Sequence, residues 1–405
     1  MTTRLPSGEP HFACALSTLA DASAAAREVC KLVAERMEER PLDLAILFVS
    51  LDFADEVSEI VERISAELKP RHLVGCTGES IVGDGREIEG SPAVSLWGAS
   101  LPDVDLQAMH LEFEPSAEGG SFVGWRGDPL EDEASDAVLI LLGDPYSFPP
   151  DEFLQRITDQ YPKMPIMGGM ASGGDAPGQN RLVVDGRVVN SGAVGVKISG
   201  PVAVRSVVSQ GCKPIGRPFV ITKARHNVIE ELGGKSPMEQ LQDLFAELTP
   251  DEKQLLHRGL HVGRVINEYQ DSFSRGDFLV RNVIGADPQT GALAIGDYVR
   301  PGQTVQFHVR DATTADEDFR ELLGDSKVRQ FSARGGLLFT CNGRGTRLFP
   351  KPHHDAEVCQ QTLGSIPVAG FFAQGEIGPV GGKNFLHGFT ASVVLFGAKA
   401  SQANP

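Results

Sequence analysis

The segments LLFTCNGRG at 337–345 and PVAGFFAQGEIG at 367–378 carry the clearest fold signal in this sequence. Each begins with a short apolar run and breaks at glycine, which is typical of a buried strand that ends in a loop. Residues 354–363 between them have the length and pattern of a helix, and 389–396 form another apolar run. The pattern therefore predicts a strand, a helix, a second strand, a loop and a closing strand.

The same pattern occurs twice earlier in the chain. A strand at 44–49 precedes an amphipathic helix that begins near Val57, and a strand at 137–142 precedes a helix that begins near Phe153. The distances from early strand to later glycine are 30, 30 and 33 residues, for Ala45 to Gly75, Val138 to Gly168 and Leu337 to Gly370.

We therefore predict three copies of one strand-helix-strand-loop-strand unit, with Gly75, Gly168 and Gly370 at equivalent strand ends. The predicted fold class is α/β, mixed with α+β, in which the repeated units form sheets flanked by helices. A chain of 405 residues has the length of two associated domains.

Composition limits the function classes. The 37 Lys and Arg against 54 Asp and Glu give a net charge of −17, which repels nucleic acid and anionic membranes. No apolar run approaches the roughly 20 residues of a membrane span, and no signal peptide is recognisable, so we expect a soluble, cytoplasmic protein. The 6 cysteines are scattered without a CxxC pair, which favours reduced thiols and predicts neither a metal nor a cofactor.

Residues 231–330 have a different character. Ser236 and Thr249 each begin a capping box with proline at the first helical position, so two short helices are predicted after them. Strands are predicted at 277–283, 292–295 and 304–309, and a domain boundary is plausible near residue 230.

Two motifs are better explained by structure than by chemistry. The segment Gly234-Lys235-Ser236 resembles the end of a phosphate-binding loop, but Ile229 stands where that motif needs its first glycine. Lys235 is therefore better explained as a turn residue before the capped helix. His353, His354 and Cys359 include metal-binding residue types, but neighbouring residues on a helix point about 100° apart, so we predict no metal there.

Cys341 ends a predicted buried strand and is followed by Asn342-Gly343-Arg344-Gly345. A neighbouring guanidinium lowers the pKa of a thiol, so Cys341 is a candidate nucleophile, with a buried strand-end cysteine as the alternative. Glu79 and Glu376 each follow a glycine after a strand, where a carboxylate can hold an ammonium or amide group. The alternative for each is a solvated loop glutamate.

Four segments together resemble the signatures of the FIST family: GCKPIG at 211–216, NVIEEL at 227–232, FTCNGRG at 339–345 and GFFAQGEIG at 370–378. This resemblance implies a sensory module with N- and C-terminal parts. The family occurs in bacterial signalling proteins and beside an F-box in a eukaryotic ubiquitin-ligase subunit. It implies a lead-in at 1–41, a FIST N-terminal domain at 42–230, a FIST C-terminal domain at 231–398 and a tail at 399–405.

The resemblance also implies that the chain binds a small ligand, possibly an amino acid, and passes the signal to a downstream signalling protein. We predict a pocket between the two halves. One wall is formed by Cys341, Asn342, Gly343, Arg344 and Gly345 with Gly375 and Glu376. Candidates for the other wall are Gly211 and Cys212, and the segment Gly75–Glu79, which includes Cys76 and Gly78.

Within this pocket, the planar fork of Arg344 suits a ligand carboxylate and Glu376 suits an ammonium group. The alternative is that the two side chains pair with each other. Two other functions remain open at this point: an enzyme that uses Cys341 in acyl or thiol chemistry, and a protein-interaction scaffold.

Overall fold

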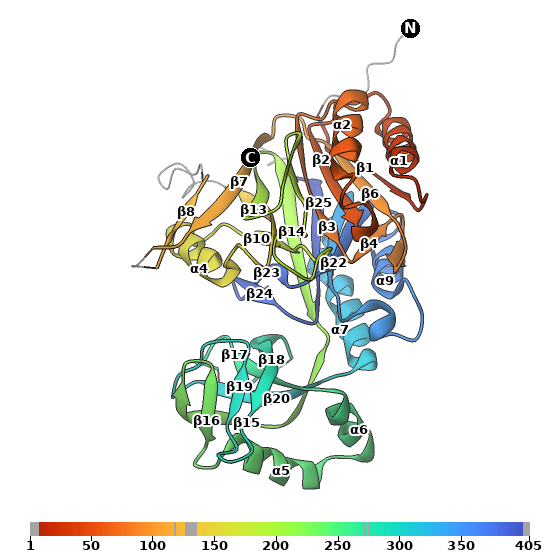
Figure 1. Ribbon diagram of the computed structural model, residues 1–405. Coiled ribbons are helices and arrows are strands. Elements are labelled where there is room, and N and C mark those ends of the chain that lie inside the picture. Colours follow the sequence, from red (N-terminus) through yellow and green to blue (C-terminus); the bar gives the residue numbers. More distant parts are fainter. Residues whose placement is uncertain (1–7, 117–118, 126–135, 271, 274, 400–405) are drawn as a thin grey trace, which may run out of the picture. The chain divides into compact units, whose positions relative to one another are not determined.

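The computed structural model describes residues 8–116, 119–125, 136–270, 272–273 and 275–399. The chain divides into two compact units (Figure 1). Unit 1 comprises 1–208, 320–386 and 391–405, and unit 2 comprises 209–319 and 387–390. The fold is the mixed α/β class that the sequence predicted.

Unit 1 is built from the three predicted copies, each of which holds two parallel strands joined by a helix. The elements of the first copy are β1 (His11–Ser17), α1 (Ala22–Met37), β2 (Leu44–Ser50), η1 (Leu51–Phe53), α2 (Val57–Glu67), β3 (His72–Gly78), β4 (Ser80–Gly83), β5 (Arg86–Glu89) and β6 (Val94–Ser100). Those of the second are β7 (Asp105–Glu114), β8 (Ser121–Val123), β9 (Val138–Gly143), α4 (Pro150–Gln160), β10 (Ile166–Met170), β11 (Leu182–Val184), β12 (Arg187–Val189) and β13 (Ala193–Ser199).

The third copy is interrupted by unit 2. It begins with β14 (Val202–Gln210) and resumes at α7. Its later elements are α7 (Ala312–Gly324), α8 (Ser326–Gln330), β21 (Gly335–Cys341), η3 (Gly345–Arg347), α9 (His354–Leu363), β22 (Val368–Ala373), β23 (Glu376–Val380), β24 (Lys383–His387) and β25 (Thr390–Ala398).

The strand register confirms the repeat. Gly75 lies opposite Leu47, Gly168 opposite Leu141 and Gly370 opposite Leu338, each in a parallel pair. A Cβ atom on these glycines would lie 2.3, 1.8 and 1.8 Å from the carbonyl oxygen of the opposite leucine, so no side chain fits. The three glycines lie inside their strands rather than at the strand ends, where the sequence analysis placed them, because the close contact is with the partner strand.

The three copies also exchange hairpins in a closed cycle. The hairpin β4–β5 of the first copy pairs with β22 of the third, β11–β12 of the second with β3 of the first, and β23–β24 of the third with β10 of the second. The resulting sheet orders are β1-β6-β2-β3-β11-β12, β24-β23-β10-β9-β13-β7-β8 and β14-β25-β21-β22-β4-β5. Every sheet therefore has an edge from another copy.

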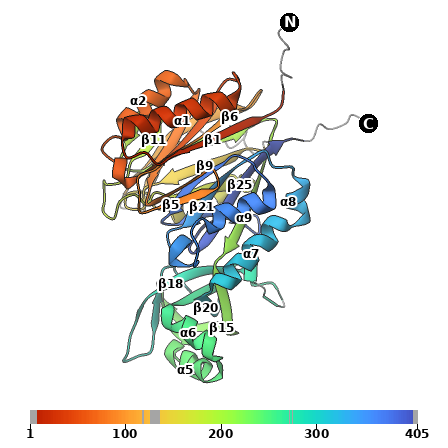
Figure 2. The same cartoon turned by 90° about the vertical axis from the view of Figure 1, so that its right-hand side faces the viewer.

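The core of unit 1 lies where the three sheets face one another. Phe48, Ile140 and Phe339 come from equivalent strands of the three copies and belong to one buried cluster. The rings of Phe48 and Phe371 stack with centroids 5.3 Å apart. Helices α1 and α2 cover the outer face of the first sheet (Figure 2), where a second apolar cluster lies, and α4 packs on the sheet of the second copy.

Unit 2 contains a closed barrel with strand order β15-β16-β19-β18-β17-β20. Its elements are β15 (Cys212–Arg225), β16 (Val228–Leu232), α5 (Pro237–Glu247), α6 (Pro250–Arg258), β17 (Leu260–Val265), η2 (Arg275–Asp277), β18 (Phe278–Ala286), β19 (Leu293–Ile295) and β20 (Thr304–Arg310). Both predicted capping boxes are present, at Ser236 and Thr249. Among the described residues, no helix is long and apolar enough to cross a membrane.

Candidate functional site

The structure brings several predicted site residues together where strands of unit 1 end. The backbone N–H of Glu79 donates to Ser172 Oγ over 2.9 Å, and the Ser172 hydroxyl donates to the carbonyl of Phe372. Arg347 forms an ion pair with Glu79 and donates to the carbonyl of Asn342 over 2.9 Å. Glu79 therefore lies beside the Cys341–Asn342 turn, and the assignment of Gly75–Glu79 to a ligand site stays a prediction.

Gly375 and Glu376 follow β22 in the chain and contact β10 of the second copy. Glu376 is fully buried and is opposite Gly169 in the β10–β23 pair. The carbonyl of Gly375 accepts a hydrogen bond of 2.8 Å from the backbone N–H of Met170. Gly211 and Cys212 belong to unit 2. Their assignment to one ligand site with the other residues stays a prediction.

Arg344 is fully buried and its guanidinium is held by Asp355. Nε donates to Asp355 Oδ2 over 2.7 Å, and Nη2 donates to Oδ1 over 2.8 Å. Thr340 donates to the same carboxylate over 2.6 Å, and the ring of Phe349 lies 5.2 Å from the guanidinium. A bidentate pair in this position anchors the start of α9. The sequence analysis gave a structural ion pair as the alternative for Arg344, but with Glu376 as the partner and not Asp355.

A second buried carboxylate lies beside this ion pair. Glu87 of β5 accepts a hydrogen bond of 2.9 Å from the backbone N–H of Ala356, and its own N–H donates to His353 Nδ1 over 3.0 Å. Burial, together with the negative charge of Asp355, raises the pKa of Glu87 to about 8. Burial also acts to raise the pKa of Asp355, but the charge and hydrogen bonds of Arg344 hold that pKa well below its ordinary value.

His353 and His354, where the sequence analysis predicted no metal, bind different structural partners. His353 lies in the left-handed region at the N-cap of α9 and binds Glu87, as described above. The ring of His354 stacks on Phe349 and its Nδ1 lies 2.8 Å from Asp355 Oδ1. Cys359 is buried on the same helix, and burial raises its thiol pKa.

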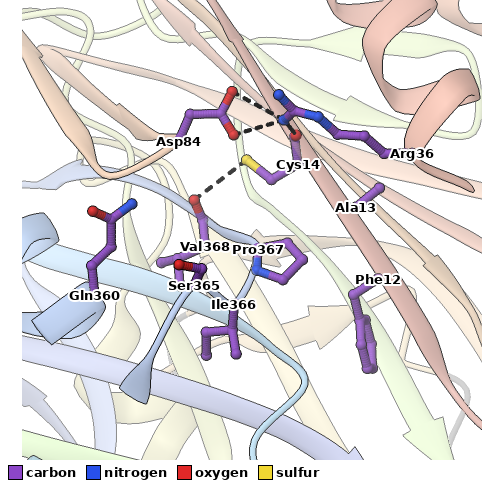
Figure 3. A pocket seen from close by; sticks show the side chains of 10 residues that line it. All are labelled: Phe12, Ala13, Cys14, Arg36, Asp84, Gln360, Ser365, Ile366, Pro367 and Val368. Carbon is purple, nitrogen blue, oxygen red and sulfur yellow. Dashed lines mark hydrogen bonds and ion pairs between the residues drawn. The ribbon is translucent and has the colours of Figure 1, made fainter. Parts of the chain in front are cut away.

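A pocket of about 350 Å³ lies in unit 1, between the first and third copies (Figure 3). Arg36 of α1 and Asp84 of the β4–β5 turn form an ion pair on one side, with Nη1 2.8 and 3.0 Å from the two carboxylate oxygens. Gln360 of α9 contributes an amide, which lies close to Gly85 of the same turn. The remaining lining residues are Phe12, Ala13, Cys14, Ser365, Ile366, Pro367 and Val368.

Phe12, Ala13, Cys14 and Val368 are the buried residues of the pocket lining. Cys14 is buried and its Sγ donates to the carbonyl of Val368 over 3.3 Å. Burial raises the pKa of Cys14 to about 12, so the thiol is neutral near pH 7. The pocket lining therefore combines apolar side chains with a cation, a carboxylate and an amide.

The hairpin exchange relates this pocket to a second junction. We call the contact of the β4–β5 turn with β22 the open seam, and the contact of the β11–β12 turn with β3 the closed seam. Both turns are Asp-Gly pairs with positive φ, at Asp84-Gly85 and Asp185-Gly186. Gly83 lies opposite Ala369 in the open seam, and Val184 lies opposite Val74 in the closed seam.

Sequence reasoning did not identify the pocket residues. The Asp-Gly pairs are a recognisable signal for two-residue hairpin turns, and the repeat makes the two turns equivalent. The sequence does not show that a hairpin of one copy pairs with a strand of another copy. The sequence analysis therefore did not group residues of β1, α1 and α9.

Family comparison agrees with this architecture. The FIST N domain matches residues 43–235, and the FIST C domain matches residues 237–379. The chain belongs to the FIST family. FIST domains are a sensor-like family, and these matches do not show the relation to an F-box subunit that the sequence resemblance implied. The division between the two FIST matches falls inside unit 2, between β16 and α5.

Relatives of nearly full length occur in mycobacteria. The chain is 43% identical over 383 residues to an uncharacterized protein of Mycobacterium tuberculosis strain H37Rv, which covers 94% of this chain and 98% of that protein. It is 40% identical over 380 residues to an uncharacterized protein of Mycobacterium bovis, which covers 94% of this chain and 97% of that protein.

Proposed function

We propose that this FIST protein is an intracellular signal-transduction sensor that binds a small ligand, an amino acid, in the pocket of the open seam. Two observations support the proposal: membership of a sensor-like family and the presence in unit 1 of a pocket with mixed lining. The second carries it, because a concave, mostly apolar pocket with a few convergent polar groups is the usual form of a small-molecule site.

The size of the pocket favours a small metabolite. A volume of about 350 Å³ is at the lower end of the range of about 300–1,000 Å³ that ligand pockets span. Arg36 and Asp84 supply one charge of each sign, which an amino acid needs. A nucleotide or a peptide would need more room or more cationic groups than this lining provides.

We place the ligand in the open seam rather than at the strand ends. Arg344 was the predicted partner of a ligand carboxylate, but its guanidinium lies in the interior and its fork already binds Asp355. Arg36 has a side chain that is 43% exposed, so a solute reaches it from solvent.

The location also suggests how a signal would leave the site. A bound ligand would contact β1 and α1, the β4–β5 turn, and the segment from α9 to β22, so it would connect elements far apart in the sequence. Stabilising these elements in one arrangement is a population shift that a downstream signalling protein can recognise.

A thermal-shift screen of the full chain against small metabolites of different charge classes tests the function. A ligand present at 100 times its Kd stabilises the folded protein by about 2.7 kcal/mol, which is readily measured. We expect at least one amino acid to raise the melting temperature. If no small molecule of any class stabilises the protein, the sensor proposal is wrong.

A further inference from the structure

Each of the three hairpin exchanges leaves one backbone N–H of the receiving copy beside the hairpin. The residue concerned lies two positions before the repeat glycine of its copy, and the three are Leu73, Ile166 and Val368. The N–H of Leu73 donates to the carboxylate of Asp185 over 3.1 Å, and the N–H of Ile166 donates to Asn384 Oδ1 over 2.8 Å. Two of the three hairpins therefore supply a side-chain oxygen to this N–H.

The open seam leaves the equivalent N–H, that of Val368, without an acceptor among the residues that the structure describes. The N–H of Gly336 donates to the carbonyl of Pro367 over 2.9 Å, so in this parallel pair the N–H of Val368 is directed away from β21, toward the β4–β5 hairpin. Val368 is buried and lines the pocket. A buried backbone N–H without an acceptor is rare and costs free energy, so an oxygen placed here is stabilising.

The acceptor that the closed seam uses is present in the open seam but binds elsewhere. Asp84 occupies the position of Asp185, and the two have nearly the same positive φ, 46° and 44°. In both seams the strand pairing extends to the residue before this aspartate. The Asp84 carboxylate is directed at Arg36, as Figure 3 shows, with its oxygens 2.8 and 3.0 Å from Nη1. A change of partner therefore requires chiefly another side-chain rotamer of Asp84.

We infer that Asp84 is a latch with two positions that opens and closes this seam. In the position that the structure shows, Asp84 binds Arg36 and the seam is open. In the other position, Asp84 accepts a hydrogen bond from the N–H of Val368, as Asp185 does from Leu73, and the seam is closed. Asp84 and Val368 both line the pocket, so closing the seam narrows it. The latch controls access to the pocket and does not depend on which ligand the pocket holds.

The charges are compatible with both positions. The side chains of Arg36 and Asp84 are 43% and 29% exposed, and an ion pair with this exposure contributes little to stability. A hydrogen bond from a backbone N–H to a carboxylate is charge-assisted and stronger than a neutral one. When Asp84 leaves, Arg36 keeps its hydrogen bond to the carbonyl of Cys14 and its access to solvent. Neither position therefore leaves a buried charge without a partner.

One substitution between the copies explains why this seam is the open one. In the closed seam, His72 Nδ1 lies 3.0 Å from Asp185, so the ring helps to hold the aspartate beside Leu73. His72 lies three residues before Gly75, and the residue three before Gly370 is Pro367. Proline has no side-chain donor, so nothing at this position competes with Arg36 for Asp84.

Hydrogen exchange of the ligand-free full chain, measured at single residues, tests the latch. We expect the amide of Val368 to have a protection factor about 10- to 100-fold lower than that of Leu73, the difference expected for one hydrogen bond to a charged group. Arg36→Gln removes the cation that holds Asp84. With this variant we expect the protection factor of Val368 to rise about 10-fold.

Two further variants and a matched control identify the parts of the latch. Pro367→His supplies the ring that His72 supplies in the closed seam, so we expect it to raise the protection factor of Val368 as well. Adding Asp84→Ala to Arg36→Gln removes the acceptor, and the gain in protection is lost. The control is Asp185→Ala, which lowers the protection factor of Leu73 and leaves that of Val368 unchanged.

The latch is overturned if Val368 is as protected as Leu73 in the wild-type chain, or if neither Arg36→Gln nor Pro367→His raises its protection factor. Circular dichroism of each variant confirms that it is folded before its exchange is interpreted. Because no ligand is present, a negative result leaves the proposed sensor function standing. A metabolite screen that finds no ligand removes that function and leaves the latch standing.

Discussion

The open and closed seams have the same Asp-Gly turn, the same kind of strand pairing and different partners for the aspartate. In the closed seam, Asp185 is held by His72 and by the backbone of Leu73. In the open seam, Asp84 is held by Arg36, a residue of α1, and a pocket lies beside the turn. The comparison teaches that two equivalent Asp-Gly turns use different partners, and that Pro367 of the open seam stands at the position of His72 in the closed seam.

In the open seam, β5 also holds the hairpin through further contacts. Glu87 binds the start of α9, and Glu89 accepts hydrogen bonds from the backbone and the hydroxyl of Thr346. The Arg344–Asp355 ion pair holds the same end of α9 from inside. We therefore expect substitutions of the residues that hold β5 and α9 to lower the free energy of unfolding more than substitutions of the pocket residues.

The largest expected effect is that of Arg344→Ala. It leaves the Asp355 carboxylate buried without its cation, so we expect a loss of about 3–5 kcal/mol in the free energy of unfolding, measured by denaturant titration. At the closed seam, Asp185→Ala removes a partly exposed carboxylate, and we expect a loss of about 1 kcal/mol. Equal losses for the two variants would show that the open seam has no such anchor.

A smaller effect tests what the two seams share. Gly370→Ala and Gly75→Ala each place a Cβ atom against the carbonyl oxygen of the partner strand, at 1.8 and 2.3 Å. Because backbone must move in both cases, we expect each variant to lose about 1–3 kcal/mol. Gly90→Ala is a control, because a Cβ atom there meets no neighbour within 4 Å, although its positive φ introduces some strain. If Gly370→Ala or Gly75→Ala were as stable as wild type, the close contact of these glycines with the partner strand would be contradicted.

The third prediction concerns pH and the buried acid of the open seam. The pKa of Glu87 is about 8 in the folded protein against an ordinary value of 4.5, so between these values the folded state holds a proton that the unfolded chain releases. This group therefore makes the protein less stable as pH rises from 4.5 to 8. Glu87→Gln removes this contribution and keeps an acceptor for the N–H of Ala356.

Denaturant titrations of wild type and Glu87→Gln at several pH values measure this difference. We expect the stability of the variant relative to wild type to increase across the window and to level off above pH 8. A constant difference would mean that Glu87 titrates normally in the folded protein, and that the charges of Asp355 and Glu89 do not act on it as the geometry indicates.

The smallest expected effect is on stability at the pocket mouth. Arg36→Gln and Asp84→Asn each break a partly exposed ion pair, so we expect a loss of at most about 1 kcal/mol without ligand. The same variants are expected to lose ligand affinity strongly. Differential scanning calorimetry with and without ligand separates the two quantities. A loss of several kcal/mol in the ligand-free protein would make this pair a structural element instead.

Local patterns in the sequence predicted much of the fold. Apolar runs identified the paired strands of each copy, the spacing of Gly75, Gly168 and Gly370 identified the repeat, and both capping boxes of unit 2 were correct. These features depend on periodicity and on short-range backbone hydrogen bonds, which a single sequence displays. The closed barrel was not predicted, because strand order depends on contacts between distant segments.

The pocket was not predicted for the same reason, because it also depends on contacts between distant segments. Arg344 looked like a ligand group because it follows a strand and a glycine, but its partner Asp355 lies on the next helix and takes its fork. The sequence analysis did not single out Arg36, which lies on α1. Asp84 belongs to the same copy as Arg36, and the exchange of hairpins brings this pair beside α9 and β22 of the third copy; the sequence carries no local mark of that exchange.

The most direct test of the central claim is a crystal structure of the protein with a saturating concentration of its best-binding amino acid. The account predicts the ligand in the open seam, in contact with Arg36 and Asp84. A ligand found beside Glu79, Cys341 and Asn342 at the strand ends, with the Arg36–Asp84 pair intact, would contradict it.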